Sequence, residues 1–243
     1  MMTRLRRAGL LWPTVFAGLG CVMLLALGTW QVQRLQWKQG LIDRIERRAT
    51  AEPVSLAAVL ETWAETQDVE YMRVRLAGRF RHGLERHVYT VVQGQVGWRV
   101  VTPLETADGR IVLVDRGFVP DTLKDPETRA PGQVQGAVVL TGLARAPGRQ
   151  GPFVPDNDLA QNTWYWRDLA GMASSVLQPE RRAKVVPFFV EAETGPTPGG
   201  WPRGGVTRLK LSNRHLEYAI TWYGLAGALL VVYGFFARSR LVG

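Results

Sequence analysis

Two long stretches of the sequence contain no charged residue, and one lies near each end of the chain. The first runs from Ala8 to Gln33 and the second from Tyr218 to Ala237. About 20 helical residues, rising 1.5 Å each, span the roughly 30 Å hydrocarbon core of a bilayer. Each stretch is long enough to cross a membrane, and we predict transmembrane helices at residues 10–33 and 217–237.

Aromatic residues frame both stretches. Trp12 and Trp30 lie at the ends of the first, and Trp222, Tyr223 and Tyr233 lie towards the ends of the second. Trp and Tyr gather at membrane–water interfaces because they combine an apolar ring with a polar group. Their positions are typical of the aromatic belt of a transmembrane helix.

A cleaved signal peptide is the alternative interpretation of the first stretch, because Arg4, Arg6 and Arg7 give it a basic start. The apolar run is longer than the h-region of a signal peptide, and residues 30–34 are not a small-residue cleavage site. We therefore expect this span to be retained. A mitochondrial transit peptide has no room, since the apolar run begins by Ala8, and a bacterial inner membrane is the expected location.

The chain between the two spans changes to the period-two alternation of β-strands. Arg73–Phe80 shows it most clearly, and an Asp108-Gly109 turn predicts a hairpin between two later strands. The Gly/Pro-rich residues 194–200 form a surface loop. The predicted strands are residues 73–80, 87–92, 98–104, 111–114, 138–143, 185–191 and 206–211.

Helical signals are fewer in this middle region. The first helix is expected to continue to about Arg48, and Ser55 is a suitable N-cap for a short helix ending near Trp63. Asp168 is a suitable cap for another helix, which ends near Leu177. The predicted fold class is a membrane α+β protein, in which two terminal transmembrane helices flank a mostly antiparallel β domain with a few helices.

Charge near the termini predicts the orientation. The tails at residues 1–9 and 238–243 carry three and two arginines, and neither has an acidic residue. Both ends are therefore expected in the cytoplasm, with residues 34–216 forming a periplasmic domain. The region after the first span is also basic, which weakens this inference. However, long domains cross a membrane regardless of charge, so the tails carry more weight.

The net charge of +9 does not indicate nucleic-acid binding. Five of the 30 Lys and Arg lie in the two tails, which leaves 25 against 21 Asp and Glu, or +4, elsewhere. A mildly basic domain suits a surface beside anionic lipid, and no Lys/Arg cluster is interleaved with stacking aromatics. The only cysteine, Cys21, lies in the first span, so the middle domain has no disulfide.

The sequence argues against an enzyme. It has no nucleophile elbow, zinc-protease motif, Walker loop or dinucleotide-binding glycine motif. Asp115-Arg116-Gly117 is interpreted as an ion pair and turn closing a strand, and not as a catalytic acid. His82 and His87 flank Gly83 at a strand edge, without a third metal ligand, and are interpreted as surface histidines.

His215 is the unusual residue, because it lies within one turn of the second span. It is either an interfacial residue or an axial ligand to a haem, which would be the only route to a metal here. Arg34 and Arg214 flank the spans on the outer side and would contact haem propionates or lipid phosphates. The aromatic side chains placed to line such a groove, or to form the belt, are those of Trp30, Trp222 and Tyr223.

Several segments spread along nearly the whole chain form a recognisable pattern. They are Leu27–Arg34, Trp37–Lys38, Tyr71–Val74, Gly78–Phe80, Gly97–Leu104, Val114–Pro120, Pro155–Asp158 with Asn162 and Trp164, and Asn213–Gly224. In these segments and in their order, the sequence resembles the surfeit-locus cytochrome c oxidase assembly factors. This family often has a second asparagine where the chain has Arg214, and commonly a glutamine where it has Glu217.

The resemblance implies a role in building haem–copper cytochrome c oxidase, with its catalytic subunit and other assembly factors as partners. It also implies that haem a is handled transiently and that the family histidine corresponds to His215. The alternative is a membrane scaffold that stabilises assembly intermediates without binding haem. An unrelated two-span receptor domain would follow only if the resemblance were accidental.

Overall fold

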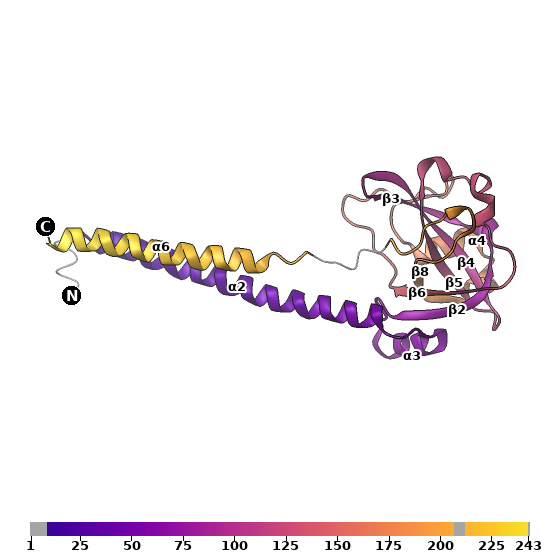
Figure 1. The fold of residues 1–243 in the computed structure, drawn as a ribbon, viewed down its shortest axis with the longest axis horizontal. Helices are drawn as coiled ribbons and strands as arrows, with labels where there is room; N and C mark the ends of the chain where they lie inside the picture. Colours follow the sequence, from indigo (N-terminus) through magenta and orange to yellow (C-terminus); the bar gives the residue numbers. More distant parts are fainter. Residues whose placement is uncertain (1–8, 207–211, 243) are drawn as a thin grey trace. The chain divides into compact units, whose positions relative to one another are not determined.

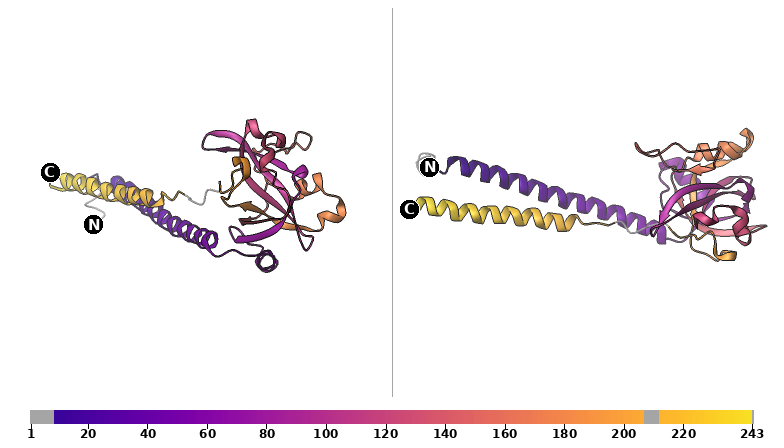
Figure 2. Two further views of the ribbon diagram at one scale, coloured as in Figure 1. Left: turned by 45° about the vertical axis from the view of Figure 1, so that its right-hand side comes forward. Right: turned by 90° about the horizontal axis from the view of Figure 1, so that it is seen from above.

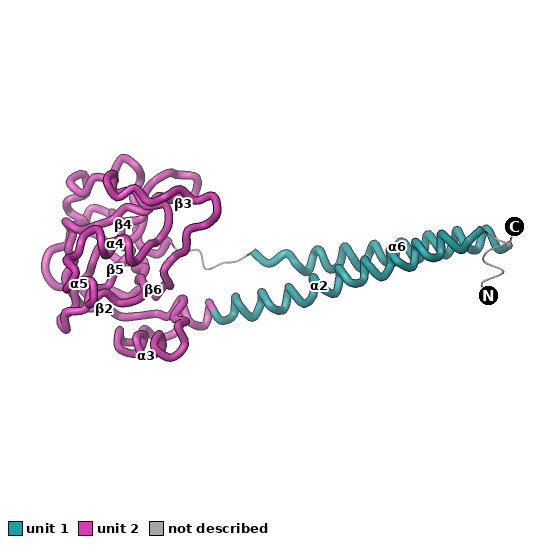
Figure 3. The backbone as a smooth tube through the Cα atoms, turned by 180° about the vertical axis from the view of Figure 1, so that it is seen from behind, with its two compact units in different colours: residues 1–44, 210–243 teal, residues 45–209 magenta. Residues whose placement is uncertain are grey.

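The computed structural model describes residues 9–206 and 212–242, which divide into two compact units (Figure 3). Unit 1 comprises Met1–Arg44 with Lys210–Gly243, and unit 2 comprises Ile45–Leu209. The first unit holds the two long helices and the second holds the β-sheet (Figure 1). This arrangement confirms the predicted fold class of two apolar terminal helices flanking a mostly antiparallel sheet domain.

Unit 1 is built from helix α2 (Leu11–Thr50), which continues into unit 2, and helix α6 (His215–Val242). The predicted extension of the first helix to about Arg48 is confirmed. By length and composition, both helices could cross a membrane, and only 11% of the residues in each apolar window are buried. A core helix of a soluble domain would be mostly buried, so these exposed apolar surfaces favour contact with lipid.

Small residues of α2 let the two helices of unit 1 approach each other closely (Figures 1 and 2). A Cβ added at Gly28 would lie 2.8 Å from the ring of Tyr223, whose hydroxyl lies 3.1 Å from that of Thr29. Eight residues earlier in α2, about two helical turns away, a Cβ added at Gly20 would lie 3.3 Å from the side chain of Leu229. Close approach at glycine is a common basis for helix pairing in a bilayer, where packing replaces the hydrophobic effect.

The strands of unit 2 form an eight-stranded sheet in the order β1-β2-β6-β8-β5-β4-β3-β7. Five of the eight strand pairings among the described residues are antiparallel, and β1–β2, β3–β7 and β5–β8 are parallel. The strands are β1 Val54–Ser55, β2 Arg73–Phe80, β3 Arg86–Val92, β4 Gln95–Thr106, β5 Ile111–Pro120, β6 Val138–Arg145, β7 Thr163–Trp164 and β8 Val185–Ala192.

An additional pairing between β2 and β4 closes five of these strands, β2, β6, β8, β5 and β4, into a ring. Strand β2 pairs with β6 over Arg73–Gly78 and with β4 over Gly78–Phe80. Gly78 is thus shared by both partners, and a Cβ there would lie 2.4 Å from the carbonyl oxygen of Glu105. A glycine permits this close backbone approach at the corner of a closed sheet.

The helices of unit 2 begin where their caps predict. Helix α3 (Leu56–Thr66) is capped by Ser55, whose Oγ accepts the Ala58 N–H at 3.2 Å. Asp168 caps α4 (Leu169–Val176) by accepting the Gly171 N–H at 2.9 Å. Buried apolar side chains of α3 and of strands β2, β4, β5, β6 and β8 form the main core, for example Val59, Leu104 and Phe188. The short helices are α5 Pro179–Arg182, η1 His82–Leu84, η2 Asp121–Leu123, η3 Pro126–Gly132 and η4 Pro198–Gly200.

Six of the seven predicted strands are confirmed, with small changes at their ends. The Asp108-Gly109 turn joins β4 to β5, and Gly109 has a positive φ of 78°. The seventh strand was predicted at residues 206–211. Val206 belongs to no strand, and residues 207–211 lie outside the described residues. The prediction that Asp115 closes a strand is wrong, because β5 continues through it to Pro120. Pairing with β4 and β8 satisfies the backbone there despite two charged residues.

Candidate functional site: the His215–Gln31 pair and the buried charges of the β domain

His215 is the first residue of α6, and its ring is held by a residue of the other helix. The Nδ1 atom of His215 lies 2.7 Å from Oε1 of Gln31. A carboxamide oxygen only accepts, so Nδ1 carries the proton and Nε2 of the neutral imidazole keeps its lone pair. Histidines that bind metals are commonly oriented by this kind of contact on the other ring nitrogen.

The His215–Gln31 pair lies where α6 begins to pack against α2. Gln31 is only 9% exposed, and Ala219, one turn into α6, is almost fully buried. The side-chain amide of Asn213 also reaches the carbonyl oxygen of Leu35 at 3.5 Å, which is a long contact. The start of α6 is therefore tied to α2 by two polar contacts within unit 1.

The other residues predicted for the site are placed differently. Arg34 stacks over the ring of Trp37 at 4.0 Å, and Arg214 pairs with Glu217 at 3.0 Å. Among the described residues, no side-chain hydrogen bond joins either arginine to the ring of His215. Tyr223 packs on α2 as described above. The two indoles of the predicted set are Trp30, which is exposed, and Trp222, which is half-buried.

Gln31 is the residue that sequence reasoning missed. It stands inside the family-like segment Leu27–Arg34, but no role was predicted for it. The sequence does contain a signal for Gln31, since a carboxamide within an apolar span needs a hydrogen-bond partner on a neighbouring helix. His215 is a candidate for that partner, but the sequence alone does not give the register of the two helices.

In unit 2, one buried charge cluster centres on Glu85. Its carboxylate pairs with Arg129 and accepts a hydrogen bond from Nε2 of His87 at 2.8 Å. Burial by itself would raise the pKa of Glu85, but the hydrogen bonds and charges of His87 and Arg129 outweigh burial and lower the pKa. The interpretation of His87 as a surface histidine is wrong, because it is 5% exposed. His82 is half-buried.

A second cluster centres on Glu191 of β8, whose carboxylate lies 2.9 Å from Arg145 of β6 and 2.6 Å from Arg167. Asp115 pairs with Arg99 in the same region, and its Oδ1 also accepts the Gly117 N–H at 3.0 Å. Burial raises the pKa of Asp115, although the Arg99 guanidinium opposes the shift. The ion pair predicted at Asp115 is therefore present, with Arg99 as its partner.

The family model of the SURF1 family matches residues 19–227 of this chain. The chain belongs to the SURF1 family. Surfeit locus protein 1 of Takifugu rubripes is 38% identical over 219 residues, covering 83% of this chain and 87% of the relative. The SURF1-like protein of Monosiga brevicollis is 39% identical, covering 96% and 90%. Surfeit locus protein 1 of Homo sapiens is 41% identical, covering 85% and 71%. All three relatives are eukaryotic.

The SURF1 match begins within α2 and ends within α6, so it includes parts of both helices and the whole β domain. His215 and Gln31 both lie inside the matched range. The Glu85 and Glu191 clusters also lie inside it. The resemblance carried by the sequence segments is thereby confirmed at the level of the family.

Proposed function

We propose that this SURF1-family chain is a membrane-bound assembly factor for cytochrome c oxidase and that it handles haem a, as cargo, at His215. Membership of the SURF1 family supports the role in oxidase assembly, and this role is that of an assembly factor and not of an enzyme. The observation that carries the haem proposal is the contact of 2.7 Å between His215 Nδ1 and Gln31 Oε1.

The donor set of this pair fits a haem iron. A neutral histidine with a free Nε2 is a common axial ligand, and Gln31 fixes the tautomer that leaves Nε2 free. Among the described residues, Nε2 of His215 has no hydrogen-bond partner. Arg214, directly before α6, and Arg34, about one turn beyond Gln31 in α2, are charged groups that would pair with propionates. Trp30, Trp222 and Tyr223 would contact the apolar macrocycle.

A transient role suits a single protein ligand. Haem a must leave again for the oxidase catalytic subunit, so moderate affinity serves delivery better than two strong ligands would. The iron chemistry belongs to the haem, while the protein residues bind it, orient it and shield it from water. Other assembly factors and membrane lipid are further proposed partners.

The proposed location is a bacterial inner membrane, with both termini in the cytoplasm and the β domain in the periplasm. Two helices long and apolar enough to span a bilayer support membrane association. The orientation rests on the basic tails, because positively charged flanks are retained on the cytoplasmic side.

The test is an absorption spectrum of the full chain purified from cells that make haem a. The variants are His215→Ala, Gln31→Leu and, as a control for loss of a histidine elsewhere, His82→Gln. We expect haem a in the wild type and in His82→Gln, little in His215→Ala, and a reduced amount in Gln31→Leu. Gln31→Leu keeps the ligand but frees its ring, so its intermediate behaviour would distinguish ring positioning from ligation.

Two results would count against the haem proposal. Equal haem in the wild type and His215→Ala would mean that another group is the ligand. Haem absent from every preparation, together with co-purification of the oxidase catalytic subunit, would favour a scaffold that stabilises assembly intermediates without a cofactor.

A further inference from the structure

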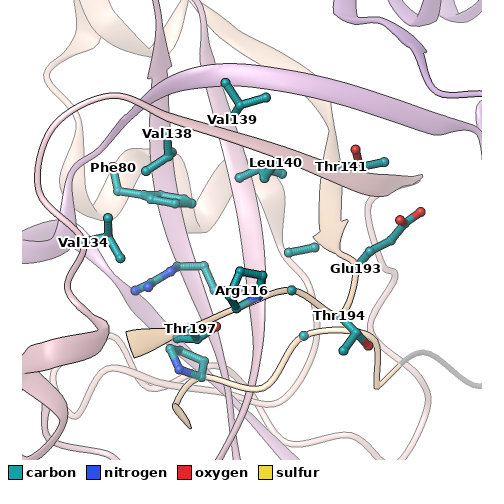
Figure 4. A pocket seen from close by; sticks show the side chains of 15 residues that line it. Phe80, Arg116, Val134, Val138, Val139, Leu140, Thr141, Glu193, Thr194 and Thr197 are labelled. Atoms are coloured by element: carbon teal, nitrogen blue, oxygen red, sulfur yellow. The ribbon is translucent and has the colours of Figure 1, made fainter. Parts of the chain in front are cut away.

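A pocket of about 400 Å³ opens at one end of the β domain, entirely within unit 2 (Figure 4). Its walls come from β2, β5, β6, the end of β8 and the loops before β6 and after β8. Most of the side chains are apolar, including Phe80, Val134, Val138 and Leu140. Volumes of this size are at the lower end of those that hold small molecules.

One charged side chain of the pocket is buried without an acidic partner. Arg116 is 8% exposed, and its side chain runs beneath the Phe80 ring towards Val134 (Figure 4). Within the described residues, no carboxylate lies within 4.0 Å of its guanidinium. Its Nη2 donates to the Gly132 carbonyl and its Nη1 to Nδ1 of His82 at 3.3 Å. A guanidinium has five N–H donors, so three are left over.

The neighbouring groups do not neutralise this charge. The Glu85 carboxylate is held by Arg129 and His87. His82 Nε2 lies 2.9 Å from the Val134 carbonyl, so Nε2 carries the proton and Nδ1 accepts from Arg116. Burial lowers the pKa of His82. The hydrogen bond to the Val134 carbonyl opposes this shift and the charge of Arg116 adds to it, so the imidazole is neutral at pH 7.

Among the described residues, Glu193 is the one acidic side chain on the pocket wall. It pairs through both carboxylate oxygens with Arg73, at 2.6 and 2.9 Å. Figure 4 shows Glu193 on the opposite side of the pocket from the Arg116 guanidinium. The described wall residues therefore present a single net positive charge on one side of an apolar cavity.

This arrangement differs from that of Arg129, the other buried arginine among the described residues, which pairs with Glu85. The half-buried Arg99 and Arg145 also pair with at least one carboxylate each. A buried cation without a counter-charge is costly, and burial lowers the pKa of Arg116 to about 10, which still leaves it charged at pH 7. A ligand that brought an anion to the pocket would supply the missing charge.

We propose that this pocket binds a small carboxylate with an apolar body, with the carboxylate on Arg116 and the body against Phe80, Val138 and Leu140. A carboxylate matches the planar fork of a guanidinium and can accept two of its free donors. One cation selects a single negative charge, and the cavity volume selects a small molecule. The proposal is independent of haem handling, because every residue in it belongs to unit 2.

The test measures calorimetric binding of cyclohexanecarboxylate and of its neutral isostere, cyclohexanecarboxamide, to the full chain in detergent. The variants are Arg116→Met, Arg116→Lys and Val138→Trp, which narrows the pocket and leaves Arg116 in place. Arg203→Met is the control for loss of an arginine: Arg203 follows the pocket residue Pro202 but is exposed and stacks on Trp201 at 4.0 Å.

We expect the carboxylate to bind the wild type and Arg203→Met alike, and to bind at least tenfold more tightly than the amide. Charge-assisted hydrogen bonds of this kind are worth about 10- to 100-fold in affinity, so Arg116→Met should lose roughly that factor. Arg116→Lys should retain part of the affinity, because it keeps the charge and loses the fork. Val138→Trp should weaken both ligands.

Three outcomes would overturn the proposal. These are no binding of the carboxylate to the wild type, equal binding of carboxylate and amide, and unchanged binding of the carboxylate to Arg116→Met. Thermal unfolding of each variant shows whether it is folded, and Arg116→Met is expected to be folded because it removes an unpaired buried charge.

Discussion

His82 should set part of the pH dependence of stability, because its pKa differs between the folded and the unfolded chain. Burial lowers the pKa of His82 from the ordinary value of 6.5. Below about pH 6.5 the unfolded chain therefore binds more protons than the folded chain. The free energy of unfolding decreases as the pH is lowered from there, until the pH is below the pKa of His82 in the folded chain. His82→Gln should flatten this part of the profile in urea unfolding followed by tryptophan fluorescence. Parallel profiles for wild type and variant between pH 7.5 and 4.5 would contradict this assignment.

Glu85 is the carboxylate on which the buried cluster depends. Glu85→Gln would leave the Arg129 guanidinium, which is 2% exposed, without its counter-charge. Removal of one partner of a buried pair costs about 3–5 kcal/mol, and we expect a loss in that range in denaturant unfolding. Glu105→Gln is the matched control, since Glu105 pairs with the exposed Arg81 and Arg181 and should lose less than about 1 kcal/mol. Equal losses would show that burial does not set the strength of the Glu85 pair.

At the scale of residues, sequence reasoning found His215 but not the environment that gives it a role. A histidine at the end of an apolar span is visible in the sequence, whereas its contact with Gln31 depends on how two distant helices align. Arg116 shows the same limit, because the sequence predicted an ion pair at Asp115-Arg116-Gly117 but not which charged residues form it. In the structure Asp115 forms an ion pair with Arg99, and no carboxylate of the described residues pairs with Arg116.

At the scale of elements, the closed ring of strands depends on the corner in β2. A side chain at Gly78 would meet the Glu105 carbonyl oxygen, which is backbone and cannot move aside cheaply. Gly78→Ala should therefore destabilise the β domain by about 1–3 kcal/mol, as overpacking does. Gly83→Ala is the control, since nothing lies within 4 Å of a Cβ added there. Thermal unfolding would test the pair, and equal stability of the two variants would exclude a special role for the β2 corner.

The elements themselves were largely predictable. Alternating patterns gave the long strands, and Ser55 and Asp168 marked the helix starts, because caps and period-two burial are local properties. The two-residue strands β1 and β7 were missed, since two residues carry no pattern. The continuation of β5 past Asp115 was also missed, because the partner of Asp115 is Arg99 on the neighbouring strand β4.

At the scale of the whole molecule, the apolar composition of the two terminal helices is consistent with membership of the SURF1 family. Two apolar helices at the ends of the chain favour membrane association, and the SURF1 match covers residues 19–227. Neither observation gives the side of the membrane on which the β domain lies. That assignment rests on the five tail arginines and is open to a direct test.

Single-cysteine labelling provides this test, because Cys21 is the only native cysteine. In a Cys21→Ser background, Phe153→Cys places a thiol in the β domain at a position that is 98% exposed, and Ser239→Cys places one beside Arg238 and Arg240. With a membrane-impermeant maleimide on intact spheroplasts, Phe153→Cys should react, and Ser239→Cys should react only after permeabilisation, since positive flanks stay in the cytoplasm. Reaction of Ser239→Cys without permeabilisation would place the C-terminal tail outside. Protection of Phe153→Cys in intact spheroplasts would place the β domain in the cytoplasm, where it could not meet haem at the outer surface.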